Sequence, residues 1–277
     1  MSVDVEDYFQ VSAFGKSVDT RDWDKFPLRV RNNTMRLLDL FDRAEIKATF
    51  FCLGWVADRD RNLIKEIHQA GHEIASHGYS HQLIYNQTPE VFKEETHRSK
   101  KLLEDIIGES VKGYRAASYS ITNKSLWALD ILADAGFEYD SSIFPIRHDR
   151  YGIADAKTIP HELSTPNGSK LIEFPLTTRR MASMNIPVAG GGYFRLYPYF
   201  LTKFFLKGVN KKQAEQFVFY LHPWEVDPDQ PRIEASRFSK FRHYNNLSKC
   251  EARLENLVKD FEFTTMHNVL AQLKLLN

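Results

Sequence analysis

Two groups of residues in the first third of the chain have the types and spacing that bind a catalytic metal ion. His77 and His81 are four residues apart and follow an apolar run, and Asp4, Glu6 and Asp7 lie where a strand-like segment ends. Two imidazoles and one carboxylate are a common ligand set for a divalent ion that keeps open positions. A further carboxylate nearby can remove a proton from water beside such an ion. The pattern therefore predicts metal-assisted hydrolysis.

Three further polar residues also follow apolar, strand-like runs, namely Arg115, Asp140 and His222. Carboxylates packed at a barrel mouth are costly unless a cation compensates them, and Arg115 would do this either in catalysis or as a structural ion pair. His222 follows residues 217–221 and is either a general acid or a hydrogen-bonded core imidazole. Because these residues share strand-end positions with the first two groups, we expect them to meet at one site.

The elements that must position these residues alternate between strand-like and helix-like segments. Apolar runs predict strands over 1–5, 48–53, 72–76, 111–116, 137–141, 170–176, 216–221 and 262–265. Caps and periodic apolar positions predict helices that begin near 32, 62, 88, 123, 198, 246 and 267, and irregular loops over 144–165 and 181–192. Gly108 and Gly208 are expected to end the helices that begin near 88 and 198. Repeated βα units imply parallel strands with helices outside, and about seven such strands fit a closed or nearly closed barrel. In such barrels the chemistry collects at the C-terminal ends of the strands.

The segment Gly-Gly-Gly-Tyr-Phe-Arg at 190–195 is a candidate for substrate contact. It lacks the Lys-Ser/Thr ending of a phosphate-binding loop. We expect instead a flexible loop that carries Tyr193 and Arg195 over a substrate groove. Tyr119 and Trp224 are core aromatics or parts of a platform for sugar rings.

Composition excludes several classes of protein. A formal net charge of +1 without a basic block does not indicate nucleic-acid binding. The two cysteines, Cys52 and Cys250, form no CxxC pair, so neither a disulfide scaffold nor a structural zinc site is expected. No apolar stretch is long enough to span a bilayer, and the first residues lack a signal-peptide pattern, so we expect a cytoplasmic protein.

Taken in their order along the chain, these motifs resemble those of the polysaccharide deacetylase family, also called the NodB-homology or carbohydrate esterase 4 family. The opening segment 2–9 and the segment 190–195 also resemble a subfamily found in exopolysaccharide and exosortase (PEP-CTERM) gene clusters. The resemblance implies a deformed (β/α)7-type barrel of the NodB fold and a single catalytic domain over 1–277. Residues 1–143 would carry the first four motifs, and 144–277 a family-specific half.

The resemblance also implies roles for residues of the first three motifs. In the family, the first motif supplies a catalytic base followed by a metal ligand, which match Glu6 and Asp7. His77 and His81 match the remaining metal ligands. Arg115 matches the third motif, whose arginine orients the catalytic base.

The last two motifs match Asp140 and His222. His222 would be the general acid, and Asp140 would support its imidazolium. Some relatives use an Asp-x-Asp arrangement, which would make Asp4 the base and Glu6 the metal ligand in place of Asp7. The sequence leaves this choice open, with Asp7 as the preferred ligand.

The implied activity is metal-dependent hydrolysis of N-acetyl groups on the amino sugars of a polysaccharide or its precursor, with release of acetate. Zinc is the expected ion, with cobalt, nickel or manganese as alternatives. The expected partner is an N-acetylated carbohydrate, and no protein partner is predicted. Two alternatives remain, a small-molecule amide hydrolase of the same fold and a non-catalytic sugar-binding relative.

Overall fold

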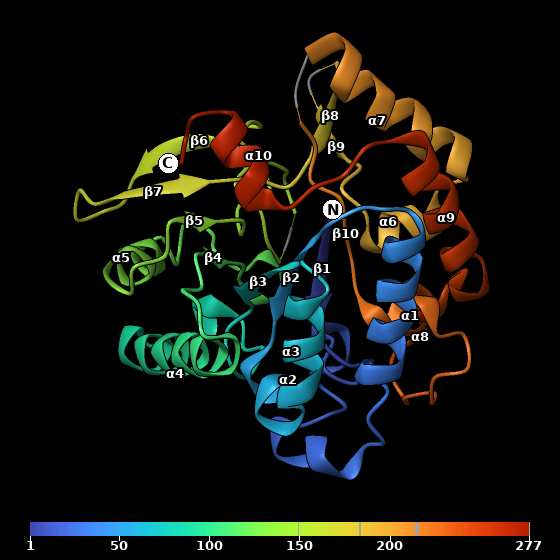
Figure 1. The fold of residues 1–277 in the computed structure, drawn as a ribbon, viewed down its shortest axis with the longest axis horizontal. Helices are drawn as coiled ribbons and strands as arrows, with labels where there is room; N and C mark the ends of the chain where they lie inside the picture. Colours follow the sequence, from blue (N-terminus) through green and yellow to red (C-terminus); the bar gives the residue numbers. More distant parts are fainter. Residues whose placement is uncertain (149, 183, 214–215, 277) are drawn as a thin grey trace.

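The computed structural model describes residues 1–148, 150–182, 184–213 and 216–276. An eight-stranded sheet of order β10-β1-β2-β3-β4-β5-β7-β6 runs through the molecule (Figure 1). Its strands are β1 (Ser2–Val5), β2 (Thr49–Cys52), β3 (Glu73–Ser76), β4 (Gly113–Tyr114), β5 (Tyr139–Asp140), β6 (His161–Ser164), β7 (Lys170–Glu173) and β10 (Tyr220–Leu221). Neighbouring strands are parallel except β6 and β7, which are antiparallel. The sheet is curled but open, with β10 and β6 as its edges.

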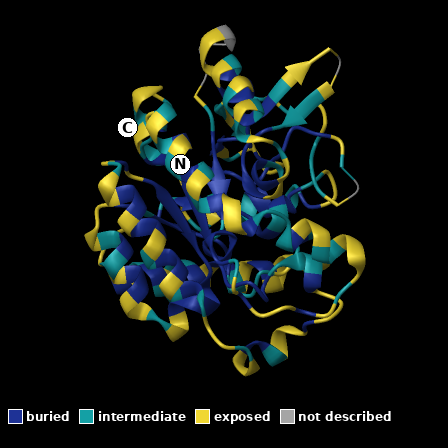
Figure 2. Ribbon diagram, turned by 90° about the vertical axis from the view of Figure 1, so that its right-hand side faces the viewer, coloured by how far each residue is buried: buried dark blue, intermediate teal, exposed yellow. Residues whose placement is uncertain are grey.

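Helices alternate with the strands along the chain, as a parallel topology requires. They are α1 (Val30–Arg43), α2 (Gly54–Arg59), α3 (Arg61–Gln69), α4 (Pro89–Ile107), α5 (Trp127–Asp134), α6 (Gly191–Leu196), α7 (Tyr199–Gln213), α8 (Arg237–Tyr244), α9 (Cys250–Asp260) and α10 (Met266–Gln272). Both α3 and α4 contact β3, and α5 contacts β7. Buried residues are concentrated on the strands, and exposed residues on the outer helix faces (Figure 2).

Helix α4 shows how local sequence determines an element of this fold. The Thr88 side chain accepts a hydrogen bond from the Val91 backbone N–H, and Pro89 occupies the first turn. Gly108 ends the helix at a φ of 75°, in the left-handed region that glycine adopts without strain. Both ends lie where the sequence predicts them.

Several predicted elements differ from the structure. Residues 262–265 form no strand. The segments predicted as loops contain β6 and β9 (Met184–Pro187), and β9 forms a hairpin with β8 (Thr178–Met181), which precedes the second of these segments. Helix α7 continues through Gly208 to Gln213 instead of ending there. A Cβ atom at Gly208 would lie 1.4 Å from Nη1 of Arg179, so this glycine makes room for a packed side chain rather than stopping the helix.

No helix in the described part of the chain is both long enough and apolar enough to cross a membrane.

Candidate active site

The C-terminal ends of the parallel strands surround one pocket of about 160 Å³. Asp4 and Glu6 come from the end of β1, His77 and His81 from the loop after β3, and His222 from the end of β10. All five line the pocket. The sequence prediction that strand-end residues meet at one site therefore agrees with the geometry for these five.

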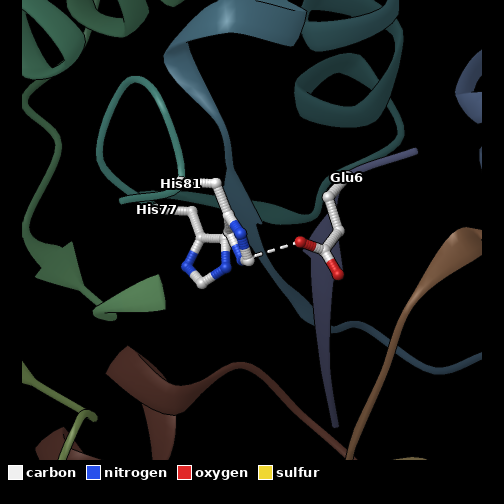
Figure 3. Close-up of side chains that lie close together, drawn as sticks. All are labelled: Glu6, His77 and His81. Carbon is white, nitrogen blue, oxygen red and sulfur yellow. Dashed lines mark ion pairs between the residues drawn. The ribbon is translucent and has the colours of Figure 1, made fainter. Parts of the chain in front are cut away.

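Glu6, His77 and His81 form the group that could hold a metal ion (Figure 3). One ligand atom from each of the three lies within 4.8 Å of the others. Nε2 of His81 is 2.7 Å from Oε2 of Glu6, and that oxygen is buried without a hydrogen-bond donor in the described structure. Burial favours the neutral acid, but the His81 and His222 imidazoles outweigh it and keep the pKa of Glu6 below its usual range.

The two histidines converge from a tight loop and not from one face of a helix. Gly78 and His81 both have positive φ values, of 73° and 53°, which reverse the chain between the two imidazoles. Nδ1 of His77 is 2.8 Å from the Arg115 carbonyl oxygen. A carbonyl only accepts, so Nδ1 carries the hydrogen and Nε2 keeps a lone pair for the pocket. Burial lowers the pKa of His77 to about 4, which also favours the neutral, ligating form.

Asp7, the preferred ligand from sequence, points elsewhere. Its Oδ2 accepts hydrogen bonds from the backbone N–H groups of Arg29 (2.7 Å) and Val30 (2.9 Å), at the start of α1. Its Oδ1 accepts from the Tyr8 N–H at 2.9 Å. The first N–H groups of a helix lack partners within the helix and attract a carboxylate, which explains this placement. Asp7 thus caps α1, and its position does not fit the ligand role; the Asp-x-Asp alternative, with Glu6 at the metal position, fits.

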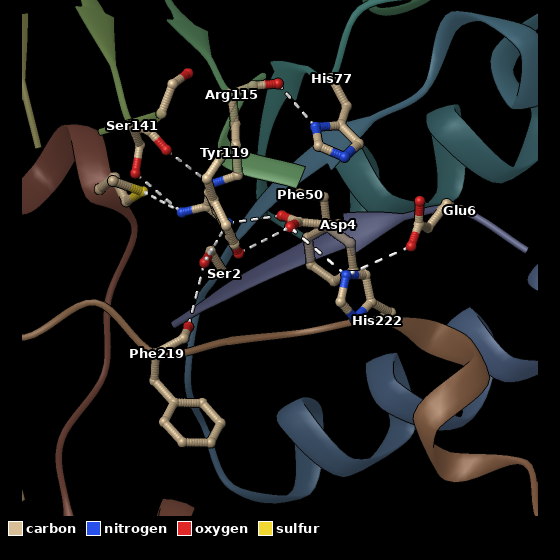
Figure 4. A network of polar contacts seen from close by, with 12 residues as sticks. Ser2, Asp4, Glu6, Phe50, His77, Arg115, Tyr119, Ser141, Phe219 and His222 are labelled. Atoms are coloured by element: carbon tan, nitrogen blue, oxygen red, sulfur yellow. Dashed lines mark hydrogen bonds and ion pairs between the residues drawn. The ribbon is translucent and has the colours of Figure 1, made fainter. Parts of the chain in front are cut away.

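Asp4 is held by a buried arginine (Figure 4). Nη1 of Arg115 lies 2.6 Å from Oδ1 of Asp4, and neither side chain is more than 3% exposed. Arg115 also donates to the Ser2 hydroxyl and to the carbonyl and hydroxyl of Ser141. With one oxygen fixed in this way, Oδ2 of Asp4 remains on the pocket side, 3.9 Å from Nε2 of His222. The geometry therefore suits Asp4 as a base whose second oxygen faces the pocket.

His222 lies between two glutamates. Its Nε2 is 3.4 Å from Oε1 of Glu6, and its Nδ1 is 2.8 Å from Oε1 of Glu225. Burial opposes protonation, but Glu6 and Glu225 outweigh it and raise the pKa of His222 to about 9. The imidazole is therefore protonated at neutral pH, as a general acid must be.

Sequence reasoning missed Glu225, although a signal was present. The side chain accepts a hydrogen bond from the backbone N–H of His222 at 3.0 Å, which forms a capping box over the short helix Pro223–Val226. The sequence His-Pro-Trp-Glu at 222–225 places a glutamate at the third helical position, where a capping box requires one. The same carboxylate binds the imidazole, so one local motif both starts the turn and orients the histidine.

Asp140, expected from the sequence to support His222, lies in a different network. It is paired with Glu173 across β5 and β7, and both side chains are fully buried. Its Oδ1 accepts from the Ser142 hydroxyl at 2.5 Å. Burial raises the pKa of Asp140 to about 6 and the pKa of Glu173 well above its usual value, and a proton held by the pair allows a hydrogen bond between them. Glu225 therefore takes the place beside His222 that the sequence assigns to Asp140.

A Glu173→Gln variant should make the stability of the fold less dependent on pH. The unfolded chain releases the proton of this pair above the ordinary carboxyl pKa, roughly 4. In the folded protein the pKa values of the two carboxyl groups are raised. The pair therefore makes its full contribution to the free energy of unfolding below a pH of roughly 4, and this contribution falls as pH rises through about 6. Glutamine donates to Asp140 without taking up a proton.

The variant is therefore expected to be more stable than the native protein by about 1–2 kcal/mol at pH 8 and to lose this advantage at pH 4. Urea unfolding at the two pH values measures the difference. Equal pH slopes for the two proteins would contradict a shared proton.

Tyr119 and Trp224, two predicted substrate contacts, line the pocket but are largely buried. The Tyr119 hydroxyl is 3.4 Å from Oδ2 of Asp4. The Trp224 indole N–H donates to Oε1 of Glu6 at 3.3 Å, and its ring stacks on His222 with centroids 5.0 Å apart. Both aromatics are thus placed to hold the reacting side chains, in addition to forming the wall of the pocket.

Arg195 does not lie on a flexible loop. It belongs to α6, and its buried guanidinium binds Oε2 of Glu225 at 2.6 Å. Its other nitrogens donate to the carbonyls of residues 242, 243 and 245 at the end of α8. With its donors used internally, Arg195 positions Glu225 and α8, whereas Tyr193 is partly exposed and lines a second hollow beside the pocket.

Glu6, His77 and His81 fit a divalent ion on three observations. The donor set is two imidazoles and one carboxylate, which suits zinc and several other first-row metals. Oε2 of Glu6 is a buried carboxylate oxygen with no hydrogen-bond donor among the described residues, and a cation would satisfy it. His77 has the backbone acceptor that usually orients a ligating imidazole.

Two known families match consecutive parts of the chain. Residues 20–139 match the polysaccharide deacetylase family, and residues 141–271 match a domain of unknown function, DUF3473. The second part supplies β7, which pairs with β5, and β10, which pairs with β1. Both parts therefore contribute strands to the same sheet, and His222 comes from the part without an assigned function.

Individual relatives give similar results. A peptidoglycan deacetylase of Helicobacter pylori is 32% identical over 108 residues, which are 39% of this chain and 36% of that protein. The chain spans about a third of the length of the curated relatives it matches first. A putative polysaccharide deacetylase from Mycobacterium smegmatis aligns with 99% of this chain and 89% of its own, at 18% identity and a TM-score of 0.63.

A second solved structure, PuuE allantoinase, aligns with 84% of this chain and 68% of its own, at 19% identity and a TM-score of 0.54. At these identities the two structures establish the fold alone. They confirm the predicted deformed α/β barrel, with a curled parallel sheet.

Proposed function

Because the chain carries a polysaccharide deacetylase domain, we propose that it is a metal-dependent hydrolase that removes N-acetyl groups from amino sugars of an exopolysaccharide or its precursor. The observation that carries the proposal is the meeting of Glu6, His77 and His81 with Asp4 and His222 in one pocket. Three ligands, a base and an acid are what hydrolysis of an unactivated amide needs.

A divalent ion held by Glu6, His77 and His81 would polarise the acetamide carbonyl and activate a water molecule, and zinc is the ion we propose. Asp4 accepts the proton of the attacking water on Oδ2, while Arg115 holds that carboxylate in place through Oδ1. His222 donates the proton on Nε2 to the sugar nitrogen as the carbon–nitrogen bond breaks. Acetate and a free amine are the products.

The shape of the site favours a sugar chain over a small isolated amide. Of the described residues in 181–195, only Gly192 and Arg195 line the catalytic pocket, so these residues do not close over it. A second hollow shares Tyr151, Gly192, Tyr220 and Arg242 with the catalytic pocket and extends it. A small-amide hydrolase would need no such extension, and a non-catalytic binder would need no carboxylate and imidazole placed as base and acid.

The activity is tested by acetate release from N-acetylglucosamine oligomers, with protein stripped of metal and then reloaded with zinc or cobalt. We expect release that depends on the ion. A His77→Ala protein is expected to lose both tight metal binding and activity. Release that continues in the stripped protein, or in His77→Ala, would contradict the proposal.

A further inference from the structure

The second hollow is the feature that the proposed reaction does not use. It has a volume of about 320 Å³, twice that of the catalytic pocket. Its outer part is lined by Tyr193 and Leu196 of α6 and by Phe238 and Phe241 of α8. Because the two hollows share four lining residues, a ligand bound in one extends directly into the other.

The apolar side chains of this hollow are unusually exposed. Phe238 and Phe241 are three positions apart on α8, so they lie on the same helix face, and they are 67% and 56% exposed. Leu196 across the hollow is 48% exposed. Grouped exposed apolar residues beside a pocket commonly mark a binding surface. Flat aromatic faces of this kind suit the apolar faces of sugar rings.

An exposed arginine lies on the wall between the two hollows. Arg242 is exposed and lines both hollows. Its guanidinium lies 5.4 Å from the Phe238 ring and beside the Tyr151 hydroxyl, and it has no carboxylate partner in the described part of the chain. Arg150, also exposed, lines the catalytic pocket and donates to the Ser12 carbonyl.

Other charges of the site are already balanced. Arg115 is paired with Asp4 and Arg195 with Glu225. No Asp or Glu of the described residues lines the second hollow. An arginine kept exposed in this setting suits an incoming anion, which it can bind through two parallel hydrogen bonds.

We propose that the second hollow is a subsite for the sugar next to the acetamido sugar, and that this neighbour or its linkage carries an anionic group that binds Arg242. This proposal rests on the proposed deacetylase function and names its substrate class, an anionic glycan instead of a neutral one. The anion is a carboxylate, as in a uronic acid, or a phosphate, as in a sugar linked through phosphate.

Three probes distinguish a carboxylate from a phosphate as the anionic group. The first is tetra-N-acetylchitotetraose, and the second is the same tetramer with one sugar, the neighbour of an acetamido sugar on its non-reducing side, oxidised at C6 to a carboxylate. The third is UDP-N-acetylglucosamine. We expect kcat/KM for at least one anionic probe to exceed that for the neutral tetramer by about tenfold, and to fall as salt is added. Preference for the oxidised tetramer assigns a uronate, and preference for the nucleotide sugar assigns a phosphate.

The Arg242→Gln variant should remove this preference, mainly through KM, by lowering kcat/KM much more for the anionic probes than for the neutral tetramer. Arg237→Gln is the matched control, because Arg237 is exposed on the same helix and lies outside both hollows. The subsite is contradicted if native protein prefers the neutral tetramer, or if Arg242→Gln lowers kcat/KM equally for neutral and anionic probes.

Binding of the same probes, measured by calorimetry on zinc-loaded protein, separates the subsite from the reaction. If no probe is deacetylated but the anionic ones bind more tightly and lose this advantage in Arg242→Gln, the proposed function fails and the subsite stands. Equal binding of neutral and anionic probes to native protein would overturn the subsite whatever the activity.

Discussion

Replacing Glu6 with glutamine is expected to abolish tight zinc binding and turnover together. The amide keeps the size of the carboxylate but loses the charge and the anionic oxygen that faces His81 at 2.7 Å. Changes in residues that only orient a ligand already cost about 10–100-fold in metal affinity, so loss of a ligand should cost more than about 100-fold. Competition with a chromogenic chelator measures the affinity, and acetate release measures the turnover.

Asp7→Asn is the matched control, since the adjacent carboxylate is the ligand preferred from sequence. Its contacts are with the first N–H groups of α1, so the variant should keep zinc and most of its activity. Loss of the cap charge should lower the free energy of unfolding by about 1 kcal/mol. The reverse result, with zinc lost in Asp7→Asn and kept in Glu6→Gln, would overturn the assignment of Glu6 as the carboxylate ligand.

The contrast between Glu6 and Asp7 shows what the sequence can and cannot predict. Side chains alternate along a strand, so residues 4 and 6 point to one side and residue 7 to the other. That rule was available from sequence and favours the pair Asp4 and Glu6. The competing demand, that the start of α1 needs an acceptor, was hidden, because α1 begins at Val30 and not near Asn32.

The apolar runs in the sequence made both the fold and the placement of the site residues at strand ends predictable. The apolar runs before Asp7, His77, Arg115, Asp140 and His222 predicted parallel strands, whose C-terminal ends meet at one edge of a sheet. Contacts made by the second half of the chain were not predictable. Arg195 and the end of α8 are brought together by tertiary packing alone, and no local period in the sequence reports such a contact.

The second large loss of activity is expected when His222, the proposed general acid, is replaced. His222→Ala should keep zinc but reduce N-acetyl hydrolysis by about 10²–10⁴-fold, because the amine leaving group must be protonated as it departs. Hydrolysis of 4-nitrophenyl acetate should fall much less, because nitrophenolate leaves without a proton. The ratio of the two rates therefore reports on the acid step alone. An equal fall for amide and ester would contradict the assignment of His222.

Glu225→Gln should show the same amide-selective loss, in a milder form of about 10–100-fold. Glu6 and Glu225 both raise the pKa of His222, but an ion bound at Glu6 would neutralise much of its charge. Glu225, held by Arg195 at 2.6 Å, then remains as the anion that keeps the imidazole protonated. The amide rate of the variant should therefore fall further as pH rises from 6 to 8, while its ester rate and zinc affinity stay close to native. If Glu225 were only structural, amide, ester and zinc binding would weaken together, with no change in the shape of the pH profile.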